Sequence, residues 1–327
     1  MVINKLCIID GSYFLHRALK TPDIYDLTFN GVRTGGIFQF LRILTFNLDN
    51  LGAYPIVMFD GGLSKRRLEI HPDYKRSVQK QEERTRYEKG EMTQSEIEEY
   101  ESSVEYLNTY RFSRSVITDI LKKLGIPTMM EYGTEGDDLI AVATKLAKNS
   151  IILTDDKDMI QLVSSKVTVK RPMTGQLWDE KELRSKGYRD GEHYMLTKAI
   201  VGDGSDNIPQ LCKGVGEKKA VVLADNIMNN TLSQFLADNG KYKYVKDLLD
   251  TDYINNLQRN ISMVNLLGQI DNEEFISQVM MSALRTSYDS IIDVDGAMSI
   301  LMSYGIKEVD VPELVRMVQM SKYNISI

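Results

Sequence analysis

Three short apolar segments, each followed by or ending in aspartate, most constrain what this chain can fold into. They are "KLCIID" (5–10), "YPIVMFD" (54–60) and "SIILTDDKD" (150–158). Near-continuous runs of Ile, Val, Leu, Phe and Met are typical of parallel strands buried on both faces. Amphipathic helical patterns lie between them, at 35–52 and 134–149. This alternation predicts an α/β fold with a mostly parallel central sheet flanked by helices.

Residues 62–115 interrupt the alternation. The segment begins basic and aromatic, turns acidic at 95–106, and leads into a helix expected over 94–124, with Thr93 and Glu96 as its capping box. About fifty residues is too long for an ordinary connection between a strand and the next helix. We interpret the segment as a partly helical insertion with a function of its own.

The C-terminal part of the chain has a different pattern from the core expected at 1–180. It is helical with short loops, and we assign 181–285 to a smaller helical domain. The tail, 286–327, contains an amphipathic helix at 295–305 and has no clear role.

Acidic residues follow each predicted strand and begin the next helix. In an open parallel sheet, ligands bind beyond the carboxyl ends of the strands. The carboxylates expected at that edge, or facing it, are Asp10, Asp60, Glu135, Asp137, Asp138, Asp156 and Asp158. The helix at 134–149 is expected to begin with a capping box between Thr134 and Asp137. Asp203 and Asp206 share a face if their stretch is helical. We predict that all nine carboxylates converge.

Carboxylates that lie close together need cations, because their repulsion would otherwise raise their pKa values. Oxygen-only ligands indicate Mg²⁺, with Mn²⁺ as a substitute. Two such ions can activate a water and stabilise the leaving oxygen in phosphodiester hydrolysis. Taken singly, an aspartate after a strand is more often a helix cap or turn former, and acidic residues are favourable at any helix N-terminus. The metal hypothesis therefore depends on convergence.

The composition does not exclude an anionic partner. The net charge is −6, but basic runs at 65–67 and 74–80 matter more than the sum. No apolar run approaches the roughly 18–20 residues needed to span a bilayer, and the first ten residues lack a signal-peptide layout. Cys7 and Cys212, far apart in the chain, suit a reducing cytoplasm.

The stretch "VGDGSDNIPQLCKGVGEKKA" (201–220) contains a glycine turn followed by adjacent lysines. It is not a nucleotide phosphate loop, because no Ser or Thr follows Lys218. It is not a dinucleotide fingerprint either, because Lys219 stands where the third glycine is needed. A metal site, a grip on a phosphate polymer and an ordinary turn between helices stay open.

Taken together, the motifs resemble the 5′-nuclease or flap endonuclease superfamily, above all phage 5′→3′ exonucleases and the 5′-nuclease domain of bacterial DNA polymerase I. The matching segments occur in family order: "IIDGSYFLHRA" (8–18), "TGGIFQFLRIL" (34–44), "VMFD" (57–60), "HPDYK" (71–75), "EGDD" (135–138), "DDKDMIQLV" (155–163) and "GDGSDNIP…GVGEKKA" (202–220). The resemblance implies a PIN-like core, a helical arch at 62–115 and a C-terminal helix–hairpin–helix-type domain.

The resemblance also implies two metal positions. The carboxylates expected around the first ion are Asp10, Asp60, Glu135 and Asp137, with Asp138 nearby. The carboxylates expected around the second ion are Asp156, Asp158, Asp203 and Asp206. Asp10, Asp60, Asp156 and Asp158 are expected to carry catalysis together with Lys75, which matches a lysine that neutralises charge on the scissile phosphate.

Several residues are expected to bind DNA. Tyr74 is placed to stack on an unpaired base. Val78 stands where relatives often carry an arginine, so Arg76 or Lys80 is the expected substitute. Gly214 and Gly216 match a hairpin whose amides approach a DNA phosphate, with Lys218 and Lys219 adding positive charge and a K⁺ on its carbonyls suggested by analogy. Asp155 is an additional carboxylate of unknown effect.

The resemblance implies a structure-specific 5′→3′ exonuclease or flap endonuclease. Its expected substrates are 5′ ends, flaps, nicks and RNA primers on DNA during replication or repair, the last by RNase H-type cleavage. We expect a monomer in the cytoplasm of a bacterial or phage-infected cell; a single-strand-binding protein or sliding clamp is a further partner that the tail could dock. There are two alternatives. The first is a PIN-type ribonuclease, which "GVGEKKA" disfavours. The second is a junction-binding protein without catalysis, which the full carboxylate set disfavours.

Overall fold

The computed structural model describes residues 1–249, 252–268, 270 and 272–326; the side chain of Val78 lies outside what is described. By packing, the chain divides into two compact units. Unit 1 comprises residues 1–59, 77–129 and 278–327, and unit 2 comprises 60–76 and 130–277. This division crosses the core expected at 1–180, and the functional boundaries drawn from the sequence stay a prediction.

Unit 1 contains three parallel strands and most of the long helices. Its elements are β1 (Val2–Asp10), α1 (Gly11–Leu19), β2 (Thr28–Phe29), β3 (Val32–Arg33), α2 (Gly35–Leu48), β4 (Tyr54–Met58), α4 (Val78–Lys89), α5 (Gln94–Lys123), β5 (Thr128–Met129), the larger part of α13 (Glu273–Asp289), α14 (Val294–Ser303), α15 (Val311–Ser321), η2 (Lys322–Asn324) and β9 (Ile325–Ser326). β4 pairs in parallel with both β1 and β5, with Ile8 opposite Ile56. The strands expected at 5–10 and 54–60 are confirmed.

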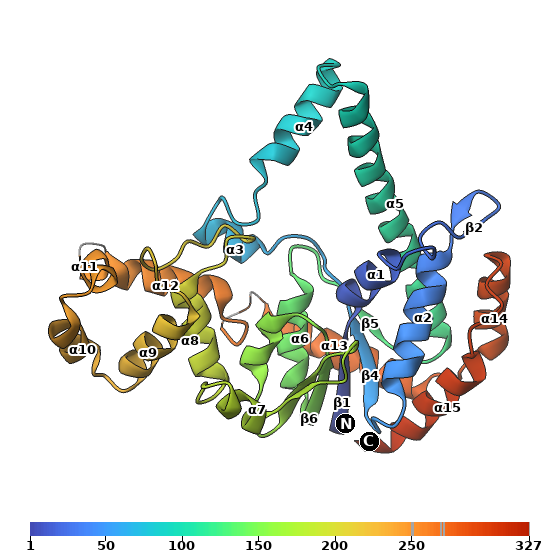
Figure 1. The fold of residues 1–327 in the computed structure, drawn as a ribbon. Coiled ribbons are helices and arrows are strands. Elements are labelled where there is room, and N and C mark those ends of the chain that lie inside the picture. The colour runs from blue at the N-terminus through green and yellow to red at the C-terminus, as the bar shows by residue number, and fades with distance from the viewer. Residues whose placement is uncertain (250–251, 269, 271, 327) are drawn as a thin grey trace. The chain divides into compact units, whose positions relative to one another are not determined.

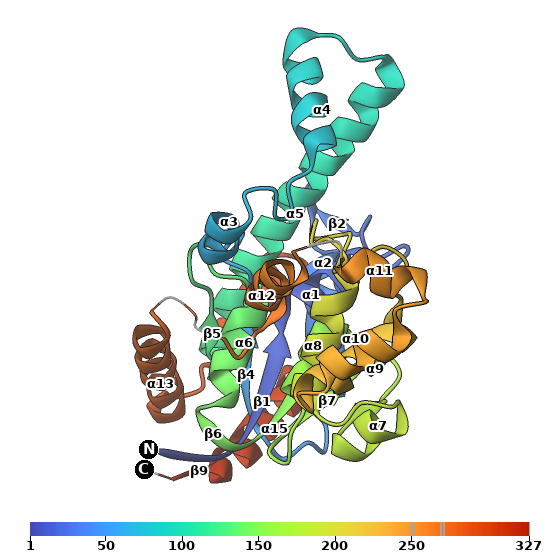
Figure 2. The ribbon, with the colours of Figure 1, turned by 90° about the vertical axis from the view of Figure 1, so that its left-hand side faces the viewer.

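Helices α4 and α5 meet at their connecting turn and diverge from it like the legs of an inverted V, and α5 extends away from the strands of unit 1 (Figures 1 and 2). Tyr87 of α4 stacks on Tyr100 of α5 with ring centroids 4.5 Å apart, and its hydroxyl donates to Glu101 at 2.8 Å. The predicted capping box is present, because Thr93 and Glu96 bond reciprocally at the start of α5. Much of the insertion expected at 62–115 is therefore a helical pair.

The C-terminal tail is part of the core of unit 1. Val311, Leu314 and Val318 of α15 are fully buried, and α15 packs on α2 and β4. The chain then returns as β9, which pairs antiparallel to β1 with Ile3 opposite Ile325. The amphipathic helix expected at 295–305 corresponds to α14, so burial in unit 1 accounts for the apolar pattern of the tail.

Unit 2 carries the remaining strands and the short helices of the C-terminal half. Its elements are α3 (Lys65–Ile70), α6 (Gly136–Thr144), β6 (Ala147–Leu153), η1 (Lys157–Leu162), β7 (Val167–Lys170), β8 (Leu177–Trp178), α7 (Glu180–Ser185), α8 (Gly191–Val201), α9 (Glu217–Met228), α10 (Leu232–Asn239), α11 (Lys243–Leu249) and α12 (Tyr253–Val264). β6 pairs in parallel with β7, and β8 is antiparallel to β7.

Two local predictions in unit 2 were wrong. The helix expected at 134–149 is shorter, because Glu135 is the N-cap of α6 and residues 147–153 form β6. The capping box with Thr134 is absent; instead the Asp60 carboxylate accepts the Gly136 N–H at 2.7 Å. The condition under which Asp203 and Asp206 would share a helix face is not met, because they lie in a turn closed by a bridge between Asp203 and Ile208.

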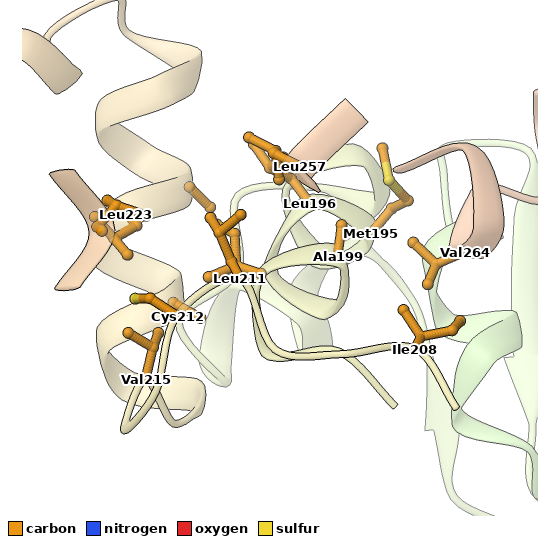
Figure 3. Close-up of a cluster of buried hydrophobic side chains, with 14 of the residues drawn as sticks. Met195, Leu196, Ala199, Ile208, Leu211, Cys212, Val215, Leu223, Leu257 and Val264 are labelled. Carbon is orange, nitrogen blue, oxygen red and sulfur yellow. The ribbon is translucent and has the colours of Figure 1, made fainter. Parts of the chain in front are cut away.

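A hydrophobic cluster holds the helical part of unit 2 together (Figure 3). Met195, Leu196 and Ala199 of α8 contribute to it alongside Leu223 of α9 and Leu257 of α12. The loop between α8 and α9 adds Ile208, Leu211, Cys212 and Val215. This packing anchors the 202–216 loop, which carries Asp203 and Asp206.

The fold is therefore α/β with a mostly parallel sheet and many flanking helices, as the sequence predicts. Among the described residues, none of the helices has the length and apolar character needed to cross a membrane.

Candidate active site

Glu135 is the most heavily engaged carboxylate of unit 2. It is 4% exposed and accepts a hydrogen bond from the Tyr74 hydroxyl at 2.8 Å. The Arg67 guanidinium contacts it at 2.9 Å and the Lys75 ammonium at 3.2 Å. As the N-cap of α6, Glu135 places a negative charge near the helix N-terminus, where such charge is favourable, although its side chain makes no capping hydrogen bond.

Arg67 is a buried clamp that the sequence analysis did not identify. It is 2% exposed, contacts Asp138 through both guanidinium arms at 2.8 Å, and donates from Nε to the Met263 carbonyl at 2.7 Å. Burial alone would lower the pKa of Arg67, but the attraction of Asp138 and Glu135 raises it instead. Both oxygens of Asp138 accept hydrogen bonds from Arg67, so the structure gives this residue an ion-pair partner. Its expected place near the first metal ion stays a prediction.

Replacing Arg67 by methionine is expected to cost ~3–5 kcal/mol of unfolding free energy, because it removes the partner of both Asp138 oxygens and one of the partners of the buried Glu135. Urea unfolding measures this directly. Lys145→Met is the matched control: Lys145 pairs with Glu273 on the surface of the same unit at 2.6 Å, where a pair contributes ~0–1 kcal/mol. Equal stability of the two variants would contradict the clamp.

Lys75 lies between two groups of acidic residues. The first group is Glu135 with Asp60 and Asp137, and the second is Asp156, Asp158, Asp203 and Asp206. Its ammonium lies 3.2 Å from Glu135 and 3.7 Å from Asp206. Its backbone is left-handed, with φ of 50°, and its N–H donates to the Asp206 carbonyl at 3.2 Å. Burial alone would lower the pKa of Lys75, but Glu135 and Asp206 raise it. A non-glycine residue held in this conformation is typical of functional sites.

A second group of acids follows β6. Asp156 accepts the Asp158 N–H at 2.8 Å at the start of η1. The Lys198 ammonium, from α8, binds Asp158 and lies 3.8 Å from Asp203. Asp203 in turn accepts bonds from the Ser205 N–H at 2.9 Å and hydroxyl at 2.5 Å. Lys198, which the sequence analysis also missed, places a positive charge between Asp158 and Asp203, as Lys75 does between Glu135 and Asp206.

The pKa values of these acids respond to their surroundings in different directions. Loss of solvation within the surrounding protein and repulsion from Asp158 raise the pKa of Asp156, although the residue reaches the surface. Burial raises the pKa of Asp206 against the opposing attraction of Lys75. For Asp203, burial is outweighed by the Ser205 hydrogen bonds, so its pKa is lowered. Burial is thus the largest cause of both raised pKa values, and the lysines oppose it only in part.

This donor set fits a hard divalent cation by ligand type, because it offers carboxylate oxygens alone and carries uncompensated negative charge. Within the described part of the chain, no three acidic, histidine or cysteine side chains surround one point closely enough to hold an ion. The Lys75 and Lys198 ammonium groups lie between the carboxylates instead.

The other predicted ligands are placed as follows. Asp60 binds the N-terminus of α6, as described above. Asp137, in the first turn of α6, is near enough to Lys75 to help raise its pKa. Asp10 caps α1 of unit 1 by accepting the Tyr13 N–H at 2.9 Å. Because Asp10 belongs to the other unit, its convergence with the remaining acids stays a prediction.

The stacking role expected for Tyr74 was wrong. The residue is 2% exposed, and its hydroxyl is committed to Glu135. Burial is the largest of the causes that raise its pKa, so it stays a neutral donor. Arg76 is exposed and pairs with Asp73 at 3.2 Å, whereas Lys80 lies in the exposed first turn of α4. Asp155 pairs with Arg171 at 2.9 Å, which gives this additional carboxylate a structural partner.

The predicted hairpin connects α8 to α9. Gly214 has φ of +80°, and Gly216 is the N-cap of α9. Lys218 is exposed in the first turn of α9. Lys219 folds back, donating to the Gly214 carbonyl at 2.9 Å with its ammonium 4.7 Å from the centre of the Tyr244 ring. Of the two lysines, Lys219 therefore also stabilises the turn itself.

Comparison with known proteins identifies the class of protein to which this chain belongs. Residues 5–187 match the model of the 5′-3′ exonuclease N-terminal resolvase-like domain. The chain belongs to this 5′-3′ exonuclease family, a family of nucleases, and the resemblance noted in the sequence is confirmed.

The chain is similar to curated exonucleases and DNA polymerases of bacteria. A 5′-3′ exonuclease of Aquifex aeolicus is 30% identical over 241 residues, which is 70% of this chain and 73% of that protein. DNA polymerase I of Lactococcus lactis is 27% identical over 82% of this chain, which spans only 28% of that polymerase.

Two solved structures share the fold. The bacteriophage T5 flap endonuclease, solved with DNA and metal ions, has a TM-score of 0.63 at 21% identity, covering 86% of this chain and all of that one. The catalytic core of Rad2 with DNA substrate has a TM-score of 0.50 at 18% identity, covering 97% and 93% of the two chains.

Proposed function

We propose that this chain is a divalent-metal-dependent 5′→3′ exonuclease and flap endonuclease that hydrolyses phosphodiester bonds at single-strand/duplex junctions. The proposal depends on the position of Lys75. Its ammonium lies within 4 Å of Glu135 from the first group of acids and of Asp206 from the second. A cation held there is suited to a phosphate that both groups of acids surround.

Several residues of unit 2 have distinct roles in the proposed reaction. Lys75 neutralises charge on the scissile phosphate as the leaving oxygen departs. Arg67 and Tyr74 hold the Glu135 carboxylate in place from the buried side. Lys198 holds Asp158 and approaches Asp203, and thereby positions the second acidic group.

Divalent ions, Mg²⁺ or in its place Mn²⁺, supply an activated water and stabilise the leaving oxygen when they are bound. Glu135, Asp156, Asp158, Asp203 and Asp206 are the carboxylates of unit 2 that we assign to two such ions, with Asp60 and Asp137 beside them. From the sequence, we also propose Asp10, at the end of β1, as a metal ligand. The protein needs no nucleophilic side chain of its own.

The substrates proposed are 5′ flaps, nicked or gapped duplexes and RNA primers on DNA, acted on in replication or repair. Gly214, Gly216, Lys218 and Lys219 form the hairpin that grips duplex phosphates, with a K⁺ on its carbonyls. Helices α4 and α5 form the arch for the single strand, with Lys80 at its base and Arg76 nearby in sequence. The enzyme works as a cytoplasmic monomer in a bacterial or phage-infected cell, where a single-strand-binding protein or sliding clamp recruits it.

Cleavage of end-labelled 5′-flap, nicked-duplex, RNA·DNA and single-stranded RNA substrates tests the proposal, each with Mg²⁺ and with EDTA. We expect cleavage near the junction of the flap, removal of RNA from the hybrid, and no cleavage in EDTA. Cleavage of single-stranded RNA alone would indicate a ribonuclease instead. Tight flap binding without cleavage in Mg²⁺ or Mn²⁺ would indicate a junction-binding protein, and either result would overturn the proposal.

A further inference from the structure

Two loops of unit 2 run side by side next to the candidate active site. Residues 61–65 directly follow Asp60, and residues 130–134 directly precede Glu135. Three backbone hydrogen bonds join the loops: Gly61 N–H to the Thr134 carbonyl at 3.0 Å, Gly133 N–H to the Gly61 carbonyl at 3.1 Å, and Lys65 N–H to the Gly133 carbonyl at 3.1 Å. The two loops therefore form one connected surface.

Glycines allow this close approach. A Cβ on Gly61 would lie 1.7 Å from the Glu131 carbonyl oxygen, which no side chain can tolerate. Gly133 has φ of +77°, and a Cβ there would lie 2.6 Å from the Lys65 side chain. The stem of Lys65 thus lies directly against the backbone of the other loop. The resulting surface is preorganised, because its shape depends on backbone contacts.

An aromatic ring and a cation project from this surface. Tyr132 is 80% exposed, and the Lys65 ammonium lies 4.7 Å from the centre of its ring. An exposed aromatic ring beside a positive charge is the combination that binds single-stranded nucleic acid, because every base has a face to stack and each nucleotide brings a phosphate. One ring and one ammonium match a single nucleotide, whereas a stable protein interface buries ~1,200–2,000 Å².

The chain places this pair near the acids. Tyr132 is three residues from Glu135, so their Cα atoms lie at most about 11 Å apart. Lys65 is five residues from Asp60, which limits that separation to about 19 Å. A base on Tyr132 would therefore belong to a nucleotide within a few positions of a phosphate held at Glu135.

We propose that Tyr132 and Lys65 form a stacking platform for an unpaired base of the substrate, one to three nucleotides from the bond that is cut. This inference rests on the proposed function and adds a binding subsite to it. Tyr132 supplies the face on which the base stacks, and Lys65 neutralises the adjoining phosphate. The platform takes over the stacking role that the sequence suggested for Tyr74, which is buried.

Fluorescence of 2-aminopurine, placed in turn at the first three unpaired positions of a 5′ flap, tests the platform with Ca²⁺ in place of Mg²⁺. We expect the wild-type protein to quench one position. Tyr132→Ala is expected to remove that quenching and weaken flap binding ~5- to 100-fold, whereas Tyr132→Trp retains both. Lys65→Ala is expected to reduce the salt slope of flap binding by about 1. Nicked duplex without a flap should bind all variants within twofold.

Tyr323→Ala is the matched control, because Tyr323 is 69% exposed in unit 1. Unchanged quenching and flap affinity in Tyr132→Ala, or an equal loss for flap and nicked duplex, would overturn the platform. Circular dichroism checks that each variant is folded. If Tyr132→Ala unfolds, normal flap binding and a normal salt slope in Lys65→Ala would overturn the platform instead. Failure of the wild-type protein to cut flaps in Mg²⁺ would count against the proposed function, whereas normal cutting by wild type and Tyr132→Ala alike would count against the platform alone.

Discussion

Asp156→Asn is expected to slow flap cleavage by ~10³-fold or more, because it removes one of the negative charges that hold a divalent cation. The exchange preserves shape and retains an oxygen to accept the Asp158 N–H. DNA affinity should stay within about threefold, since the residue lies among acids and not in a basic surface. Asp203→Asn is expected to behave in the same way. Single-turnover cleavage of an end-labelled flap and fluorescence anisotropy measure the two quantities.

Asp155→Asn is the matched control for this prediction. Asp155 is adjacent in sequence, but it pairs with Arg171 at 2.9 Å and is not in the proposed ligand set. Its cleavage rate should stay within about tenfold of wild type, since it loses only one partly exposed ion pair. Normal turnover by Asp156→Asn and Asp203→Asn would refute the assignment of the second acidic group.

Lys75→Ala is expected to slow cleavage at least ~10²-fold, the scale for losing one electrostatic stabiliser of a developing charge. Alanine keeps the Cβ, so the left-handed backbone at φ of 50° carries a similar strain in both proteins. The loss should therefore report the ammonium between Glu135 and Asp206 and not a change of backbone.

Arg76→Ala separates this effect from a general loss of positive charge. Arg76 is the next residue, is exposed, and pairs with Asp73. The Arg76→Ala variant should bind DNA modestly more weakly, and its single-turnover cleavage rate at saturating DNA should stay within about threefold of wild type. Wild-type rates in Lys75→Ala would remove Lys75 from the mechanism.

The sequence predicts the strands well because their burial on both faces leaves an uninterrupted apolar run. The same holds for α5, whose start is specified locally by Thr93 and Glu96. The start of α6 was mispredicted because its cap is not local: Asp60, far away in the sequence, binds the Gly136 N–H. A capping pattern in the sequence cannot reveal a partner that comes from a loop far away along the chain.

The candidate site was predictable in its acids and less so in its cations. Nothing in "KRR" distinguishes the buried Arg67 from Lys65 and Arg66 beside it, because burial of an arginine depends on acids brought by α6 and its N-cap. Lys198 lies on a helix whose other residues pack into a core, which hides its role. Tyr74 seemed available for stacking because an aromatic beside a lysine has the same pattern whether it faces DNA or Glu135.

Anomalous scattering from crystals of the protein grown with Mn²⁺ and an uncleaved 5′-flap DNA tests the central claim most directly. Our account predicts manganese peaks within about 2.5 Å of carboxylate oxygens from Glu135, Asp156, Asp158, Asp203 and Asp206, with a phosphate of the flap strand beside them. Peaks confined to other surfaces, or DNA bound away from these five acids, would contradict it.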